Sequence, residues 1–186
     1  MHPQPLAAAV LAGGRSTRMG SPKQHAMDGG CTLGDRMLTL ADACCADVVV
    51  SGPPGAIPGR QHIEDLAPHA GWGPLAGIEA MLADGRANRW LVLPCDMPAL
   101  TISDVRRLID AEGPVCCFGR PEQPAKPLQL PVTITVAMLP SIRAHLESDR
   151  RALGGWLSTI DVTIVDAPPA PRLRNANRPE DLAEPR

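Results

Sequence analysis

The sequence predicts an α/β domain built around a mostly parallel β-sheet that helices cover on both faces. Short apolar runs of strand length alternate along the chain with segments whose apolar residues recur at helical spacing, which is the pattern of βαβ units. Glycine and proline punctuate these segments. The 186 residues fit one domain, residues 1–186, and we see no internal repeat or second domain.

Six runs have the length and apolar character of buried strands. They are Leu6–Leu11, Val48–Ser51, Trp90–Pro94, Val115–Phe118, Leu128–Val132 and Val162–Val165. The first contains three consecutive alanines, which are weak strand formers, so this prediction depends on the flanking Pro5 and the pair Gly13-Gly14.

Helices are expected between these runs. One spans about Leu33–Cys45, where Thr32 and Asp35 resemble a capping box. A second begins at Pro74, a favoured first helical position, and a third follows Thr101. Their apolar spacing predicts as buried Leu33, Met37, Leu40, Ala41 and Cys44, then Leu75, Ile78 and Leu82, then Ile102, Val105, Leu108 and Ile109.

The second half of the chain gives weaker helical patterns. A fourth helix should start at Pro140 and bury Ile142 and Leu146, and a short last one should start at Pro179. The pair Gly154-Gly155 weakens the helical pattern of residues 150–158. Three segments rich in glycine or proline are expected to be rigid connectors, namely Gly52–Gly59, Pro121–Pro127 and Ala167–Pro171.

Composition excludes several classes of function. The 18 basic and 20 acidic side chains nearly balance, which leaves no basic field for nucleic acid and no anchor for a membrane. The N-terminal residues lack the charged region of a signal peptide, so a cytoplasmic protein is expected. The six cysteines show neither C-x-x-C nor a zinc spacing, and we interpret them as small buried hydrophobes in a reducing compartment.

The first candidate site is the loop Leu11–Lys23. Gly13 and Gly14 follow the first strand and allow backbone N–H groups to approach a ligand closely. Basic side chains, among them Arg18 and Lys23, add positive charge, and together these features suit phosphate. The spacing matches neither a P-loop nor G-x-G-x-x-G, and an ordinary turn with a solvated basic surface explains the loop equally well.

The second candidate is Asp96, which follows the run Trp90–Pro94. A carboxylate just past a buried parallel strand lies at the edge of the sheet where ligands bind and suits a hard divalent cation such as Mg²⁺. By itself, an aspartate before Pro98 is a turn cap at least as often as a metal ligand.

Two further segments carry polar groups that suit a heterocycle. Asp65 precedes the small-residue segment Gly73–Gly77, which leads into a helix and presents free N–H groups. Asn175 and Asn177 lie on one side of an extended segment by their spacing of two. Each has a plain alternative, because Asp65 suits a surface carboxylate, Gly73-Pro74 an ordinary helix start, and the asparagines a turn.

The combination is more specific than its parts. In order, LAGGRSTRMGSPK, IED, GPLAGI, PCDMP and NANRPEDL resemble the molybdenum cofactor guanylyltransferase family of nucleotidyltransferases, over residues 11–182. The resemblance implies a Rossmann-like three-layer α/β/α nucleotidyltransferase fold. It also implies transfer of GMP from GTP to the terminal phosphate of molybdopterin, with Mg²⁺ as cofactor and release of pyrophosphate.

The resemblance assigns a role to each matching residue. Lys23, Asp96 and Arg18 are implied to be catalytic, with Asp96 as the magnesium ligand. The implied nucleotide-binding residues are Leu11, Ala12, Gly13, Lys23, Ser51, Asp65 and Asp96, and Gly73–Gly77 helps to shape the base pocket. The implied pterin-binding residues are Arg18, Asn175 and Asn177.

Three positions depart from the family pattern. Pro22 stands where an aspartate often precedes the lysine, and Ser51 stands where an asparagine often contacts the nucleotide. Arg178 replaces the usual threonine of N-T-P, which removes a good helix cap. The first two put the contacts to the base and ribose in question.

Two alternatives are left open. One is a related transferase that uses CTP, such as a molybdopterin cytidylyltransferase, although Gly13 and the asparagine pair argue against it. The other is a non-catalytic nucleotide-binding module of the same fold, against which Lys23 and Asp96 argue. The expected protein partners are molybdenum-insertion and acceptor proteins in transient contact, with neither nucleic acid nor membrane.

Overall fold

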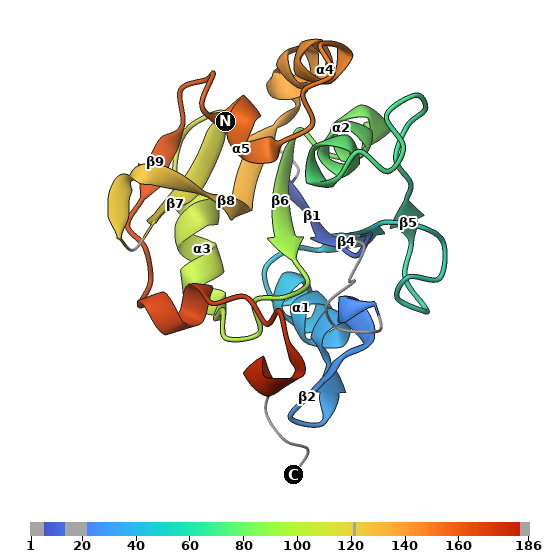
Figure 1. Cartoon of the computed structure of the whole chain (residues 1–186), viewed down its shortest axis with the longest axis vertical. Helices are drawn as coiled ribbons and strands as arrows, with labels where there is room; N and C mark the ends of the chain where they lie inside the picture. Colours follow the sequence, from blue (N-terminus) through green and yellow to red (C-terminus); the bar gives the residue numbers. More distant parts are fainter. Residues whose placement is uncertain (1–5, 14–21, 121, 183–186) are drawn as a thin grey trace.

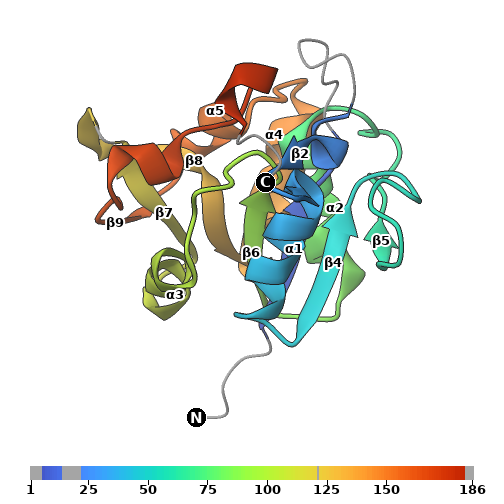
Figure 2. The same ribbon diagram turned by 90° about the horizontal axis from the view of Figure 1, so that it is seen from below.

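A seven-stranded sheet lies between two layers of helices (Figure 1, Figure 2) in the computed structural model, which describes residues 6–13, 22–120 and 122–182. The strand order is β5-β4-β1-β6-β8-β7-β9. Its members are β1 (Leu6–Leu11), β4 (Asp47–Ser51), β5 (His62–Ile63), β6 (Arg89–Pro94), β7 (Val115–Arg120), β8 (Gln123–Thr135) and β9 (Thr163–Val165). The pairs are parallel except where β8 runs antiparallel to β6 and β7, which confirms the mostly parallel sheet.

Two cores cover the two faces of the sheet. Along β1, Ala7 and Ala9 point into one core, and Ala8 and Val10 point into the other. The first core lies under α2 (Pro74–Asp84), α4 (Leu139–Glu147) and α5 (Leu153–Leu157), and the second under α1 (Leu33–Asp42) and α3 (Ile102–Asp110). The three-layer α/β/α architecture is therefore confirmed.

Neighbouring strands make an alanine-rich segment into a strand at β1. It pairs with β4 on one side and β6 on the other, and its residues from Ala7 to Val10 are at most 1% exposed. Position in the sheet therefore outweighs the low β-propensity of alanine.

The helix starts follow the predicted caps. The Thr32 hydroxyl accepts a hydrogen bond from the Asp35 N–H at 3.0 Å, and Pro74 begins α2 as expected. α1 ends at Asp42, three residues before the predicted end, so Cys44 lies beyond it. α4 starts one residue before Pro140, and both of its predicted core residues are buried.

Other predictions were wrong in detail. Ile102, the first residue of α3, is 42% exposed, because it follows the Thr101 cap on the outer side of the helix, whereas Val105 and Leu108 are buried. Only Leu153–Leu157 of the segment 150–158 is helical. The helix at Pro179 is a 3-10 turn of three residues. The remaining 3-10 helices are η1 (Lys23–His25), η2 (Val136–Met138) and η3 (Ala170–Leu173).

The strand β8 is much longer than the predicted Leu128–Val132. It starts at Gln123, so the prediction of a connector over Pro121–Pro127 was wrong, and a hairpin joins β7 to β8 there. Three strands of two residues were also missed, namely β2 (Met27–Asp28), β3 (Cys31–Thr32) and β5. Two residues are too few to show any periodicity.

A large bulge interrupts β8 near the end of the sheet where the parallel strands stop. The ladder between β6 and β8 runs from Arg89↔Thr135 to Val92↔Val132 and stops there. Continuing it would oppose Pro94 to Leu130 next to Pro131, and proline has no N–H to donate. Against β7, the register jumps from Cys117↔Val132 to Gly119↔Pro127, so two steps on β7 face five on β8. Residues 128–131 therefore have no partner in either ladder.

The six cysteines are free thiols. Cys45, Cys116 and Cys117 are buried as predicted, whereas Cys31, Cys44 and Cys95 are only partly buried. Over residues 6–13, 22–120 and 122–182, no helix combines the length and the apolar character needed to cross a lipid bilayer.

Arg89 ties α3 to the sheet. From β6, its guanidinium donates to the carbonyl oxygens of Ile109 and Ala111, each at 2.7 Å, and to the Thr133 hydroxyl at 3.0 Å. These carbonyls belong to the C-terminal end of α3, where backbone acceptors lack partners within the helix.

Replacing Arg89 with alanine is expected to lower the free energy of unfolding by about 3 kcal/mol, because charged hydrogen bonds are lost and carbonyls are left unpaired. Calorimetry should show the melting temperature falling by roughly 6–12 °C. Arg106→Ala, on the exposed side of the same helix, is the matched control and should change stability by less than about 0.5 kcal/mol. Equal melting temperatures for the two variants would contradict this role.

Candidate active site

A cavity of about 880 Å³ opens at the carboxyl edge of the parallel strands. The register explains why the predicted residues meet there. Leu11 lies beside Ser51 on β4 and beside Pro94 on β6, and Ser51 lies beside Ile63 on β5. Four strands thus end at one level, and the residues that follow them face a common space.

The glycine loop begins at this edge. The Ala12 N–H donates to the Ser51 carbonyl at 2.8 Å, which fixes the first residues after β1 against β4. A Cβ on Gly52 would lie 3.1 Å from the carbonyl carbon of Ala12, so the two turns touch through their backbones. Gly13 is exposed and lines the cavity. Gly14 and Arg18 lie outside the described residues.

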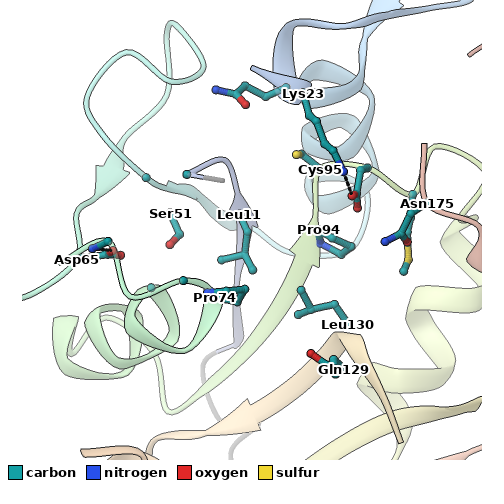
Figure 3. Close-up of a pocket in the computed structure, with 18 of the residues that line it drawn as sticks. Leu11, Lys23, Ser51, Asp65, Pro74, Pro94, Cys95, Gln129, Leu130 and Asn175 are labelled. Atoms are coloured by element: carbon teal, nitrogen blue, oxygen red, sulfur yellow. Dashed lines mark hydrogen bonds and ion pairs between the residues drawn. The ribbon is translucent and has the colours of Figure 1, made fainter. Parts of the chain in front are cut away.

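Lys23 joins three of the predicted motifs. The dashed line at Lys23 in Figure 3 marks the contact of its Nζ with Asp96 Oδ2 at 2.8 Å. The same Nζ donates to Asn177 Oδ1 at 2.6 Å. The side chains of Lys23 and Asp96 are 21% and 14% exposed, so water screens their charges only partly. Pro22 precedes Lys23 at the start of η1, and its carbonyl accepts the His25 N–H at 3.0 Å.

The C-terminal segment is fastened to the same place. The Ala176 N–H donates to the backbone carbonyl of Asp96 at 2.7 Å. Upstream, the Arg172 guanidinium lies 3.1 Å from Asp104 Oδ1, a carboxylate with a 3% exposed side chain in α3. These contacts hold Asn175 on the cavity wall and Asn177 beside Lys23.

Asp181 provides a side-chain cap at the turn around Arg178. Its Oδ2 accepts the N–H groups of Asn177 and Arg178, each at 3.0 Å. The hydrogen bond from Asn177 is the main reason why the pKa of Asp181 lies below its usual range. The turn around Arg178 is therefore capped by a carboxylate that follows it.

Asp181→Ala is expected to lower the melting temperature at neutral pH, because two N–H groups lose their acceptor. Since folding lowers the Asp181 pKa, its contribution is complete above the ordinary aspartate value of about 3.9 and is lost as the pH falls below it. Calorimetry of wild type and variant should show the difference shrinking towards about pH 3. Glu180→Ala is the exposed control, and a pH-independent difference would contradict the assignment.

The opposite end of the cavity is formed by the segment before α2. Asp65 Oδ2 accepts the Gly71 N–H at 2.8 Å, and both residues line the cavity. Gly73, with φ +91°, precedes Pro74, and a Cβ on Gly77 would lie 2.5 Å from Ser51 Oγ. Gly77 is therefore needed for close packing against Ser51, and the positive φ of Gly73 favours glycine at that position.

A buried ionic network supports this segment from behind. The carboxylate of Glu79 in α2 lies 2.7 Å from His69 Nδ1 and 3.2 Å from Arg143 Nε, and it is 5% exposed. The Arg151 guanidinium lies 3.9 Å from the centre of the Trp72 ring. These contacts connect α4 and the segment before α5 to the cavity wall.

Three carboxylate residues line the cavity, namely Glu64, Asp65 and Asp96, and Asp96 is the one that lies beside Lys23. Among the described residues, no three His, Cys, Asp or Glu side chains gather into a metal site. Mg²⁺ usually takes one or two protein carboxylates and completes its shell with water and phosphate oxygens. Asp96 therefore fits an ion that is shared with a phosphate ligand.

Cys95 lies beside Asp96 in the cavity wall. Burial, with the Asp96 charge adding to it, raises the pKa of the thiol to about 12. This environment disfavours the thiolate, which is the nucleophilic form of cysteine.

Several cavity residues were missed from the sequence. Gln24, Met97 and Cys95 lie within or beside the quoted motifs, which is a signal that could have found them. The residues of the β7–β8 hairpin gave no such signal because the pattern indicated an ordinary strand and a connector. They are Arg120, Leu128, Gln129 and Leu130.

Comparison with known proteins finds relatives over nearly the whole chain. The model of the MobA-like NTP transferase domain matches residues 8–161. A protein named probable molybdenum cofactor guanylyltransferase from Rhodopirellula baltica is 34% identical over 197 residues, covering 98% of this chain and 92% of that protein. A protein of the same name from Deinococcus radiodurans is 34% identical over 184 residues, covering 97% and 93%.

Solved structures show the same fold. Molybdopterin-guanine dinucleotide biosynthesis protein A from Archaeoglobus fulgidus superposes with a TM-score of 0.77 at 19% identity, covering 94% of each chain. 2-C-methyl-D-erythritol 4-phosphate cytidylyltransferase from Thermus thermophilus gives a TM-score of 0.67 at 18% identity, covering 93% of each chain.

Proposed function

Because the chain belongs to the MobA-like NTP transferase family, we propose that it transfers GMP from GTP to the terminal phosphate of molybdopterin. A phosphate oxygen of molybdopterin forms a bond to the α-phosphorus of GTP. The bond between that phosphorus and the bridging oxygen to the β-phosphate breaks, and pyrophosphate leaves with the electron pair. The products are the guanine dinucleotide cofactor and pyrophosphate.

This reaction needs no protein nucleophile, because the attacking group is already an anion. The chain must align two anionic substrates and offset the negative charge that spreads in the transition state. In our proposal, the backbone at Leu11, Ala12 and Gly13 receives the nucleotide phosphates, and the Lys23 ammonium neutralises them. Arg18 adds a second cation at the acceptor side.

The metal in this proposal is Mg²⁺, held by Asp96. A bound divalent ion would supply Lewis-acid polarisation of the phosphate oxygens. Asp96 also holds the Lys23 ammonium at 2.8 Å, which supports a shared role of the two residues at the phosphates.

The two ends of the cavity suit the two substrates. Ser51 and Asp65, with Gly73–Gly77 behind them, would receive the ribose and guanine, and Asp65 offers a carboxylate to the base. Asn175 and Asn177 would receive the pterin. The residues at the two ends of the cavity are far apart in sequence but line the same space at one edge of the sheet. This arrangement supports a cavity that holds two substrates side by side.

One observation carries the proposal. Lys23, Asp96 and Asn177 come from three different motifs and form one hydrogen-bonded cluster at the cavity. Asp96 lies 73 residues and Asn177 lies 154 residues after Lys23 in the sequence. A module that had lost catalysis would have no need to maintain such a cluster.

Pyrophosphate release is the test. Purified protein with Mg²⁺ and molybdopterin should release pyrophosphate with GTP and form the guanine dinucleotide, and CTP in its place should give little. Preference for CTP would make the protein a cytidylyltransferase, and inactivity with both would favour a binding module.

We also propose that residues 1–186 act as one domain in the cytoplasm. The pterin substrate and the dinucleotide product then require transient contact with molybdenum-insertion and acceptor proteins. Retention of such proteins on the immobilised full chain, dependent on bound product, would test this.

A further inference from the structure

The bulge on β8 forms a wall of the cavity that none of the sequence motifs predicted. Leu128, Gln129 and Leu130 line the cavity, and Figure 3 shows the latter two on the side of Asn175, distant from Asp65. The three extra residues on β8 turn these side chains out of the ladder, as bulges do near active sites. The wall combines two apolar side chains with one amide.

The amide of Gln129 lies against α5 at a glycine. A Cβ on Gly154 would lie 2.7 Å from Gln129 Nε2 and 3.0 Å from its Cδ, so alanine there must displace the amide. Glycine is a poorer helix former than alanine inside a helix. The residue that weakened the predicted helix thus makes room for a cavity side chain.

The chemistry of this wall suits the pterin. The pyrimidine edge of a pterin carries an amino group, ring nitrogens and a carbonyl, so donors and acceptors lie side by side. A primary amide offers both kinds of group, whereas a carboxylate or a guanidinium offers one. Leu128 and Leu130 supply the apolar contact that a planar heterocycle takes in a binding pocket.

We propose, resting on the proposed function, that Gln129 is a specificity-determining residue for the acceptor. Its amide hydrogen-bonds the polar edge of the pterin, and Gly154 is a positioning residue that allows the amide its place. Nucleotide binding at the other end of the cavity does not involve either residue.

The test compares Gln129→Ala, Gly154→Ala, the double variant and the control Gln123→Ala, which is at the exposed start of the same strand. Pyrophosphate release gives KM and kcat for molybdopterin, and titration gives the Kd of GTP with Mg²⁺. Gln129→Ala should raise the KM for molybdopterin about tenfold, as expected for one or two lost hydrogen bonds, with the Kd of GTP unchanged. The control should match wild type.

Gly154→Ala should raise the same KM without lowering the melting temperature, since alanine favours the helix. In the Gln129→Ala background it should have no further effect, because the amide it displaces is gone. Additive effects would overturn the role of Gly154.

The outcomes separate this inference from the proposed function. An active wild type with an unchanged KM in Gln129→Ala overturns the assignment of Gln129 alone, as does an equal loss of GTP affinity. A wild type that binds GTP but releases no pyrophosphate with molybdopterin overturns the proposed function, and the assignment of Gln129 falls with it.

Discussion

Asp96→Ala is expected to abolish nucleotidyl transfer while the protein stays folded. Without the carboxylate, the proposed metal loses its protein ligand, and a loss of several kcal/mol of transition-state stabilisation, about a thousandfold or more in kcat/KM, should follow. The fold should survive because the contact to the C-terminal segment uses the backbone carbonyl of Asp96, which alanine retains.

Steady-state kinetics of pyrophosphate release, with the melting temperature measured beside it, checks this result. Asp96→Asn preserves the shape of the side chain and should be nearly as inactive, since the negative charge is what the metal requires. Asp161→Ala, an exposed aspartate in a distant loop, should behave as wild type. An active Asp96→Ala protein would refute the metal assignment.

Lys23→Ala is expected to cost at least about 2 kcal/mol in the transition state, or roughly thirtyfold in kcat/KM, judging by the loss of comparable charge-stabilising donors. The partly buried ammonium of Lys23 lies 2.8 Å from Asp96 Oδ2. Its removal leaves the phosphates less well neutralised at the moment when their charge spreads.

The chain provides a matched control for Lys23. Lys126→Ala removes the same type of side chain from the exposed hairpin and should leave kcat/KM unchanged. Combining Lys23→Ala with Asp96→Ala should cost less than the sum of the two changes, because residues in contact act as a unit. Near-normal kcat/KM for Lys23→Ala would contradict its role.

The sequence could predict the edge where the cavity lies because the relevant motifs follow buried strands. Parallel strands end together, so residues after Leu11, Ser51 and Pro94 had to meet. The two-residue strand that ends at Ile63 lies at the same edge but was not predicted. The contact of Asn177 with Lys23 was not predictable in this way, since no strand leads into the C-terminal segment. It depends on the tether from Arg172 to Asp104, two residues that belong to none of the predicted motifs.

The wall on β8 was hidden for a different reason. Apolar alternation predicts a strand, but where a strand leaves its ladder depends on which residues oppose it across the sheet. Pro94 and Pro131 are 37 residues apart, and only the antiparallel register brings them near each other. The same limit applies to Gly154. The side chain that requires a glycine at this position is Gln129 on β8, not a neighbour in the same helix.

The hydrogen bond between Lys23 and Asn177 has a consequence for when the site can form during synthesis of the chain. A growing chain that has reached β9 already contains every strand of the sheet, yet it lacks the segment from Ala170 onward that bonds to Asp96 and Lys23. This contact joins residues 154 apart in sequence, and a domain folds as a unit. During synthesis, the site can therefore be completed only after the segment that follows β9 has been made.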